Sequence, residues 1–323
     1  MKILKLSYPL FLVLTVVSIL SLSGCTKSEA TKTDPVINWE NPADIFFGTL
    51  LDTTQLNATA NVPGNFIYSP GINTKLNEGV NQELKVEFTP NDANMYNSVS
   101  KTVNINVLPQ SLSNAVFNPD LTYGSLIDID GNSYRTIKIG TQTWMAENLR
   151  TTKYRNGDPI PLVSTNSAWV SLNTDAYCNY ENTSDDIKIA TMGRLYNWFA
   201  ITDSRNIAPA GWHVATDAEW SSLTNFLGTE SNAGGKLKER GNKHWNSPNT
   251  SATNSSGFTA LPGGRREYDT GLFINDTYDG FWWTSSAYNP DYSWYRYLHY
   301  SDAGIFRANF HKQYGFSVRC VQD

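Results

Sequence analysis

The sequence has little charge, few cysteines and no long basic run. Charged residues make up 17% of the 323 residues, and 30 Asp and Glu outnumber 25 Lys and Arg, which gives a formal net charge of −5. Because basic residues are not in excess, the chain is a poor match for phosphate backbones, and we expect no nucleic-acid partner. A hydrophobic content of 40% excludes a disordered chain, and the length predicts more than one domain.

The chain also lacks the motifs of metal-dependent and nucleophilic enzymes. No Cys-x-x-Cys, His-x-x-x-His or His-Glu-x-x-His occurs, and no Gly-x-Ser-x-Gly marks a nucleophile. The histidines stand apart from one another at His213, His244, His299 and His311. We therefore predict neither an enzyme nor a cofactor or metal site.

Three polar residues mimic the first half of a calcium loop. Asp128, Asp130 and Asn132 alternate around Gly131. The twelfth position of such a loop carries an acidic residue, but here it is Ile139, whose side chain has no oxygen to bind calcium. Since an Asp-Gly pair suits a tight hairpin, we interpret the segment as a hairpin turn.

The first residues have the composition of a targeting segment. Lys2 and Lys5 precede an apolar run over residues 6–22, which is shorter than the roughly 20 apolar residues of a membrane span. The tetrapeptide Leu22-Ser23-Gly24-Cys25 resembles the bacterial lipobox, in which the peptide is cut before the cysteine and the thiol is acylated. A cleaved secretory peptide and an uncleaved membrane anchor are the alternatives.

The lipobox resemblance implies an exported lipoprotein. Residues 1–24 would be its signal peptide, Cys25 the acylated first residue of the mature chain, and residues 25–34 a polar tether. The membrane is then a partner through the lipid anchor. We expect a location in the cell envelope, at the outer membrane or the cell surface.

Lipidation of Cys25 leaves an even pair of cysteines in an oxidising compartment. We predict a structural disulfide between Cys178 and Cys320, which would contribute about 5 kcal/mol to stability. The alternative is a redox or catalytic pair. In a strand, Phe316, Val318 and Cys320 lie on one apolar face, and such a face disfavours a reactive thiol.

Residues 35–108 have the pattern of strands separated by turn clusters. Apolar or alternating runs occupy residues 36–39, 64–68, 83–88 and 101–107. Their spacing predicts a sandwich of about seven short strands. Residues 39–45, 55–60 and 88–92, with Tyr96, resemble bacterial Ig-like repeats. The resemblance implies a spacer or adhesive module, and the polar residues 109–120 would form the linker after it.

Residues 121–323 hold nine of the ten tryptophans. A hairpin and a third strand over residues 125–145 are followed by two predicted helices. The first spans residues 193–200, and the second opens with the capping box Thr216-Asp217-Ala218-Glu219 and ends at Gly228. Strands return at residues 281–284, 294–300, 305–310 and 315–321. This order predicts an α+β domain whose first and last strands pair.

Several segments of this domain resemble the Fibrobacter succinogenes major paralogous domain, namely residues 128–134, 139–149, 193–198, 210–220 and 315–321. That family is similar to the C-type-lectin-like fold that also contains the formylglycine-generating sulfatase-modifying factors, and it is abundant in lipoproteins of Bacteroidota. Residues 212–220 resemble the Arg-Leu-Pro-Thr-Glu-x-Glu-Trp run of those factors, with His213-Val214-Ala215 in place of Arg-Leu-Pro. The resemblance implies a C-type-lectin-like fold but no agreed activity.

Aromatic residues crowd residues 278–300, and one face of a strand cannot bury them all. We predict a ligand-binding surface formed by Trp283, Tyr288, Asp291, Tyr292 and Trp294. Exposed Tyr and Trp stack on sugars or anchor protein partners. The alternative is that these rings fill an aromatic core. The triplet Asn289-Pro290-Asp291 resembles the Pro-centred triplets of calcium-dependent lectins, but acidic partners do not follow it, so we interpret it as a loop turn.

These features predict a multidomain protein, with an all-β Ig-like sandwich followed by an α+β C-type-lectin-like domain. We expect a lipid-anchored, non-catalytic protein that binds a glycan or a surface protein through its C-terminal domain. A structural protein of envelope assembly or display, with no small ligand, fits the same residues. An oxidoreductase related to the sulfatase-modifying factors would need a reactive thiol pair, which the predicted disulfide removes.

Overall fold

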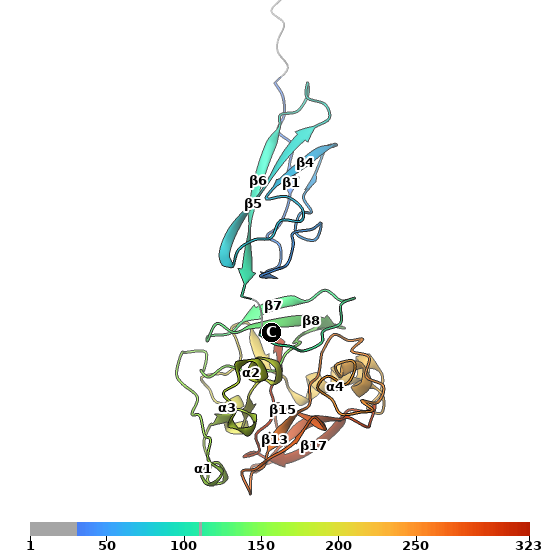
Figure 1. Ribbon diagram of the computed structural model, residues 1–323. Coiled ribbons are helices and arrows are strands. Elements are labelled where there is room, and N and C mark those ends of the chain that lie inside the picture. Colours follow the sequence, from blue (N-terminus) through green and yellow to red (C-terminus); the bar gives the residue numbers. More distant parts are fainter. Residues whose placement is uncertain (1–30, 110–111) are drawn as a thin grey trace, which may run out of the picture.

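The computed structural model describes residues 31–109 and 112–323, which form two β-rich units (Figure 1). The predicted signal peptide, Cys25 and residues 25–30 of the tether lie outside the described residues. In the described ranges, no helix has both the length and the apolar character needed to cross a bilayer.

The first unit consists of six strands in two sheets. They are β1 (Ile37–Asn38), β2 (Ile45–Phe46), β3 (Thr59–Ala60), β4 (Gly64–Ser69), β5 (Gly79–Pro90) and β6 (Val99–Leu108). One sheet has the order β2-β6-β5-β4, and β1 pairs with β3 in the other. The predicted strands are confirmed, although the number is six rather than about seven.

The core of the first unit follows from the two-residue period of its long strands. In β5, Leu84, Val86 and Phe88 are buried, whereas the side chains between them point outward. Val103 and Ile105 of β6 are buried in the same way. These residues join Trp39 and its neighbours in one hydrophobic cluster.

The first and the last strands of the second unit lie in one five-stranded sheet. Its strands are β7 (Gly124–Ile127), β8 (Ser133–Ile139), β9 (Gln142–Met145), β12 (Trp212–Val214) and β18 (Cys320–Gln322), in the order β12-β18-β9-β8-β7. Val321 of β18 pairs with Trp144 of β9, so the last strand joins the sheet of the first hairpin. It pairs with the third strand of the unit and not with the first, β7, which lies at the edge of the sheet.

The predicted hairpin turn between β7 and β8 is also confirmed. Asp128 Oδ1 accepts hydrogen bonds from the backbone N–H groups of Asp130 and Asn132, both at 2.9 Å. Gly131 has a φ of +80°, which glycine adopts without strain. Asp130 Oδ2 accepts from the Thr152 backbone N–H at 2.5 Å, so both carboxylates are used within the fold.

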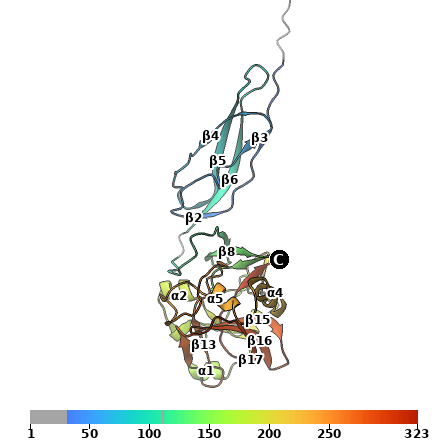
Figure 2. The same ribbon diagram turned by 90° about the vertical axis from the view of Figure 1, so that its right-hand side faces the viewer.

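A second five-stranded sheet forms the later part of the second unit (Figure 2). Its strands are β13 (Gly263–Arg266), β14 (Phe273–Asp276), β15 (Asp279–Ala287), β16 (Tyr292–His299) and β17 (Phe306–His311), in the order β14-β13-β15-β16-β17. The strands predicted at 281–284, 294–300 and 305–310 are thereby confirmed, and β15 runs three residues beyond the predicted end at 284. Of the strand predicted at 315–321, only the end belongs to a strand, β18, whereas residues 315–317 form isolated bridges.

Short helices and one small sheet connect the two large sheets. They are α1 (Asn166–Val170), β10 (Tyr177–Cys178), the 3₁₀ turn Tyr180–Asn182, α2 (Asp186–Met192), β11 (Leu195–Tyr196), α3 (Trp198–Ile201), α4 (Asp217–Leu227) and α5 (Ala233–Leu237). The helix α4 packs against β15 and β16.

The capping box of α4 is confirmed. The Thr216 hydroxyl accepts from the Glu219 backbone N–H at 3.2 Å, and Glu219 Oε2 accepts from the Thr216 backbone N–H at 2.8 Å. Gly228 follows the last residue of the helix, as predicted.

The helix predicted over residues 193–200 is wrong for its first half. Leu195 and Tyr196 form β11, which pairs with β10. The helix α3 starts only after Asn197, whose side-chain oxygen accepts from the Ala200 backbone N–H at 3.1 Å. The cap therefore interrupts an apolar run that has helical spacing.

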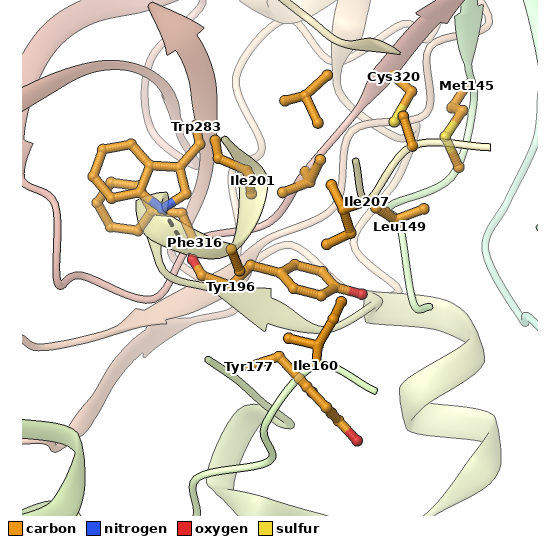
Figure 3. Close-up of a cluster of buried hydrophobic side chains, with 14 of the residues drawn as sticks. Met145, Leu149, Ile160, Tyr177, Tyr196, Ile201, Ile207, Trp283, Phe316 and Cys320 are labelled. Atoms are coloured by element: carbon orange, nitrogen blue, oxygen red, sulfur yellow. Dashed lines mark hydrogen bonds between the residues drawn. The ribbon is translucent and has the colours of Figure 1, made fainter. Parts of the chain in front are cut away.

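The predicted disulfide is not formed, and both cysteines of the described residues are free thiols. Cys178 belongs to a small cluster around Trp169, whereas Cys320 lies in the main core beside Met145 (Figure 3). Burial raises the pKa of the Cys178 thiol to about 12, and it raises that of Cys320 as well. Two separate apolar clusters thus accommodate two unpaired thiols.

The segment predicted as a linker is irregular, but its second part packs onto the second unit. The backbone N–H of Asn114 donates to the Thr191 hydroxyl at 3.1 Å, and that of Val116 donates to Glu239 at 2.6 Å. Phe117 packs against the cluster around Trp220. The residues from 114 onward therefore belong to the second unit rather than to a linker.

Candidate functional site

The loop between β15 and β16 carries the predicted binding residues on the surface of the second unit. We call Tyr288, Asp291, Tyr292 and Trp294 the loop patch. Tyr288 is 52% exposed and Tyr292 is 40% exposed, although both are large aromatic residues. Asp291 is exposed and Trp294 is half-buried. The prediction that this loop presents aromatic rings to solvent is confirmed.

The loop has a defined shape because the Asn289 side chain forms hydrogen bonds with the loop backbone. Its side-chain oxygen accepts from the backbone N–H groups of Asp291 at 3.0 Å and Tyr292 at 2.8 Å. Asn and Asp favour such turns for this reason. Lys312 Nζ, at the end of β17, donates to the carbonyls of Asn289 at 3.0 Å and Pro290 at 2.7 Å. The aromatic rings are therefore mounted on a fixed turn.

Trp294 is held between neighbours. The Tyr288 ring meets it in an edge contact, with centroids 4.8 Å apart and planes at 76°. The Arg307 guanidinium lies 3.4 Å from its ring centroid. Arg307 in turn donates to the carboxylate of Asp217, at the start of α4, with a shortest distance of 2.8 Å. One face of the Trp294 ring is thereby covered by the protein itself.

Tyr292 connects the loop patch to a second aromatic row. It meets His311 in an edge contact at 5.6 Å and 70°. His311 stacks on Tyr268 at 4.8 Å and 15°. The row continues through parallel stacks such as Phe310 on Tyr314, which lie 4.5 Å apart at 11°.

The parallel row and the loop patch differ in what they offer a ligand. Rings that stack face to face cover one another's faces and leave their edges outward. A sugar ring or a flat ligand packs against an open face of an aromatic ring. All ring contacts of Tyr288 and Tyr292 are edge contacts, and both rings are widely exposed. The two tyrosines are therefore the best-suited groups for recognition.

Trp283 does not belong to this surface, and that prediction is wrong. Its side chain is fully buried, its indole N–H donates to the Tyr196 carbonyl at 2.9 Å, and its ring lies 4.3 Å from that of Phe316 (Figure 3). Trp282, its neighbour, is buried in the other large cluster. The strand β15 is covered on both faces at this point, so both tryptophans are core residues.

The Asn289-Pro290-Asp291 triplet is used as a turn. The Asn289 side-chain oxygen already accepts two backbone N–H groups. Within residues 31–109 and 112–323, no group of three or more His, Cys, Asp or Glu is placed to hold a metal ion. In that part of the chain, the triplet therefore has no cluster of carboxylates beside it.

Sequence reasoning missed the residues that support the loop patch. Arg307, Lys312 and His311 come from β17 or its end, and Asp217 comes from α4. The pairing of β16 with β17 places Tyr292 opposite His311. One sequence pattern could have indicated these residues. Arg307, Asn309 and His311 alternate along the chain, which is typical of the polar face of a strand.

The chain is thus a β-rich protein of two folded units, and the second unit combines two sheets with short helices. It belongs to the family of the Fibrobacter succinogenes major domain, whose model matches residues 137–322. The predicted family is confirmed. No curated protein and no solved structure matches the chain.

Proposed function

We propose that this protein is a non-catalytic binding protein of the cell envelope, and that it recognises a glycan through the loop patch. The observation that carries the proposal is the exposure of Tyr288 and Tyr292, at 52% and 40%, on a turn fixed by Asn289 and Lys312. A fixed turn supports binding because little conformational freedom is lost when a ligand docks.

The chemistry of the loop patch suits a sugar. Tyrosine rings pack against the apolar faces of pyranose rings, and their hydroxyls form hydrogen bonds. The exposed Asp291 carboxylate adds an acceptor for sugar hydroxyls beside Tyr292. The surface is open, so it fits a chain or the end of a glycan better than an enclosed small molecule. We expect weak affinity for one sugar and higher affinity for multivalent display.

The rest of the chain supports a role in presentation. An acylated Cys25 would anchor the protein, the two-sheet first unit would serve as an Ig-like spacer, and the second unit would be a C-type-lectin-like domain. The strands β15–β17 lie on the side of the second unit away from the β7–β8 hairpin, where the chain enters it (Figure 1). This arrangement would turn the loop patch away from the anchor.

The test is a glycan array probed with the full chain and with three tyrosine variants. Tyr288→Ala and Tyr292→Ala should each lose most of the signal. Tyr278→Ala is the matched control, because Tyr278 is 47% exposed and lies outside the loop patch. Signals that are equal in all variants would place the glycan elsewhere. If no glycan binds, a crosslinker placed at position 288 tests whether a cell-surface protein is the ligand. If no protein is crosslinked either, the result favours a structural or display protein without a ligand at the loop patch.

An oxidoreductase role gains no support from the thiols. Cys178 and Cys320 lie in different clusters, and burial raises the pKa of each thiol. Reactive thiols have a lowered pKa and partial exposure.

A further inference from the structure

Another surface feature of the second unit is a pocket that holds two arginines. It lies between the β7–β8 turn and α2, encloses about 270 Å³ and is open to solvent. We call it the arginine pocket, and its polar lining comes from Asn132, Ser133, Arg150, Asp186 and Arg194. We propose that the arginine pocket binds a small oxyanion, in the form of a carboxylate, sulfate or phosphate group.

Arg150 is the central residue of this proposal. Its side chain stacks over the Tyr134 ring, with the guanidinium carbon 4.2 Å from the ring centroid, and its Nη2 donates to the Ser133 carbonyl at 2.6 Å. Arg150 is only 6% exposed, and its buried Nη1 has no hydrogen-bond partner among the described residues. A buried donor without a partner costs free energy, which an anion in the pocket would recover.

Arg194 supplies the second positive charge. Its Nε donates to the Arg150 carbonyl at 2.8 Å, and its Nη1 donates to Asn179 Oδ1. These bonds orient the guanidinium beside Arg150. In the described part of the chain, neither Arg150 nor Arg194 forms a salt bridge with a carboxylate. Two guanidinium charges therefore share one pocket, and neither forms a salt bridge with Asp186, the acidic residue of its lining.

Two other buried arginines of the second unit have a partner for every guanidinium nitrogen. Arg266 and Arg319 are fully buried. All three guanidinium nitrogens of Arg266 donate to carbonyl oxygens. The same holds for Arg319. Arg296 also keeps one unpartnered donor, its Nε, but it is paired with the Asp217 carboxylate. Arg150 differs because it has no such carboxylate partner among the described residues and lines an open pocket together with Arg194.

The lining also sets the class of ligand. Guanidinium groups match the geometry of carboxylate and phosphate oxygens, and the paired charges exclude cations. Asp186, the first residue of α2, is exposed and also lines the pocket. Its negative charge opposes an anion, so it limits affinity. The site therefore suits a small oxyanion held with moderate strength.

The experiment is isothermal titration calorimetry of the full chain with sodium sulfate, sodium phosphate and sodium acetate, at constant ionic strength set with chloride. We expect saturable heat with at least one of these anions. Arg194→Gln should weaken the binding roughly tenfold or more, because it removes a charged donor. Asp186→Asn should strengthen the binding a few fold, which a purely structural role of the pocket would not produce. Acetate binding alone would assign a carboxylate ligand, and sulfate or phosphate binding a tetrahedral one.

Arg240→Gln is the matched control, since Arg240 is exposed outside the pocket and its loss changes the net charge equally. It should bind as the wild type does. The Arg150→Gln variant should lose anion binding, provided that the variant protein folds. If the variant does not fold, the Arg194→Gln and Asp186→Asn variants test whether the arginine pocket binds an anion. The proposal is overturned if none of the three anions gives saturable heat, or if Arg194→Gln and Arg240→Gln bind equally well.

Discussion

Arg307 lies 3.4 Å from the centroid of the Trp294 ring, although thirteen positions separate the two residues along the chain. The contact joins β17 to β16 at the edge of the loop patch. It makes Trp294 part of a supporting frame, and it leaves Tyr288 and Tyr292 as the open rings. Predictions about the loop patch follow from this division between supporting and open residues.

The open tyrosines should contribute little to stability. Tyr288→Ala and Tyr292→Ala should each change the free energy of unfolding by about 0.5 kcal/mol or less, because both rings are widely exposed. Trp220→Ala should cost about 3–5 kcal/mol, because this ring is 1% exposed and lies 5.0 Å from that of Trp144. Urea denaturation measures all three. A similar loss in either tyrosine variant would show that the loop is core.

Asp217 should matter more than Arg307, although the two form one ion pair. Asp217 also pairs with the nearly buried Arg296 at 2.9 Å. Asp217→Asn would leave the Arg296 charge buried without a counter-charge, at a cost of about 3–5 kcal/mol. Arg307→Ala should cost about 1 kcal/mol, since that arginine is partly exposed. Chemical denaturation of both variants gives the order, and equal losses would contradict it.

Cys178 and Cys320 should remain reduced and protected in the native protein. Both thiols are fully buried with raised pKa values, so a thiol reagent should react with neither until the chain is denatured. Titration with such a reagent before and after denaturation measures this. A disulfide-linked peptide containing both residues, found by mass spectrometry of unreduced protein, would refute the free thiols.

His213 should make stability depend on pH. Partial burial by itself lowers the pKa of His213, but hydrogen bonds to Asp323 and Glu219, both 2.7 Å long, outweigh it and raise the pKa. The protonated form is thus favoured in the folded state. Its contribution is full below the unfolded pKa of about 6.5 and is lost as the pH rises through the raised value.

The variant His213→Gln isolates this contribution. Its melting temperature should fall below that of the wild type at about pH 5.5–6, and the difference should shrink by about pH 9. Differential scanning fluorimetry at matched ionic strength gives both values. A difference that is constant with pH would show that His213 acts through packing alone.

The predicted anchor depends on a single thiol. Cys25→Ala should leave the protein unacylated, and fractionation should find it as soluble protein or as retained precursor. Mass spectrometry of the mature wild-type protein should show acyl chains on its first residue. An unmodified Cys25 at that position would remove the basis for a lipid anchor.

Local patterns were enough to predict much of the fold. Alternating residues such as Leu84, Val86 and Phe88 indicate a strand because the side-chain period is a property of the backbone. The capping box at Thr216 and Glu219 is likewise complete within four residues. These predictions depend on neighbours in the chain and were confirmed.

Features that depend on distant partners could not be predicted in this way. Trp283 and Tyr288 are both aromatic residues near one loop, and only the packing on both faces of β15 makes the first core and the second surface. Cys178 and Cys320 form an even pair by count, yet they belong to different clusters. The unused donor of Arg150 is visible only when every neighbouring carbonyl is placed.

The packing of residues 114–121 has a consequence for the extent of the second unit. Glu239 is fully buried, and it accepts hydrogen bonds from the Val116 backbone N–H and from His244. The family match begins only at residue 137. A fragment cut at that point would lose the Val116 donor and strand β7, and it would leave a buried carboxylate with one fewer partner. The segment that the family model matches is therefore shorter than the length of chain that packs together in the second unit.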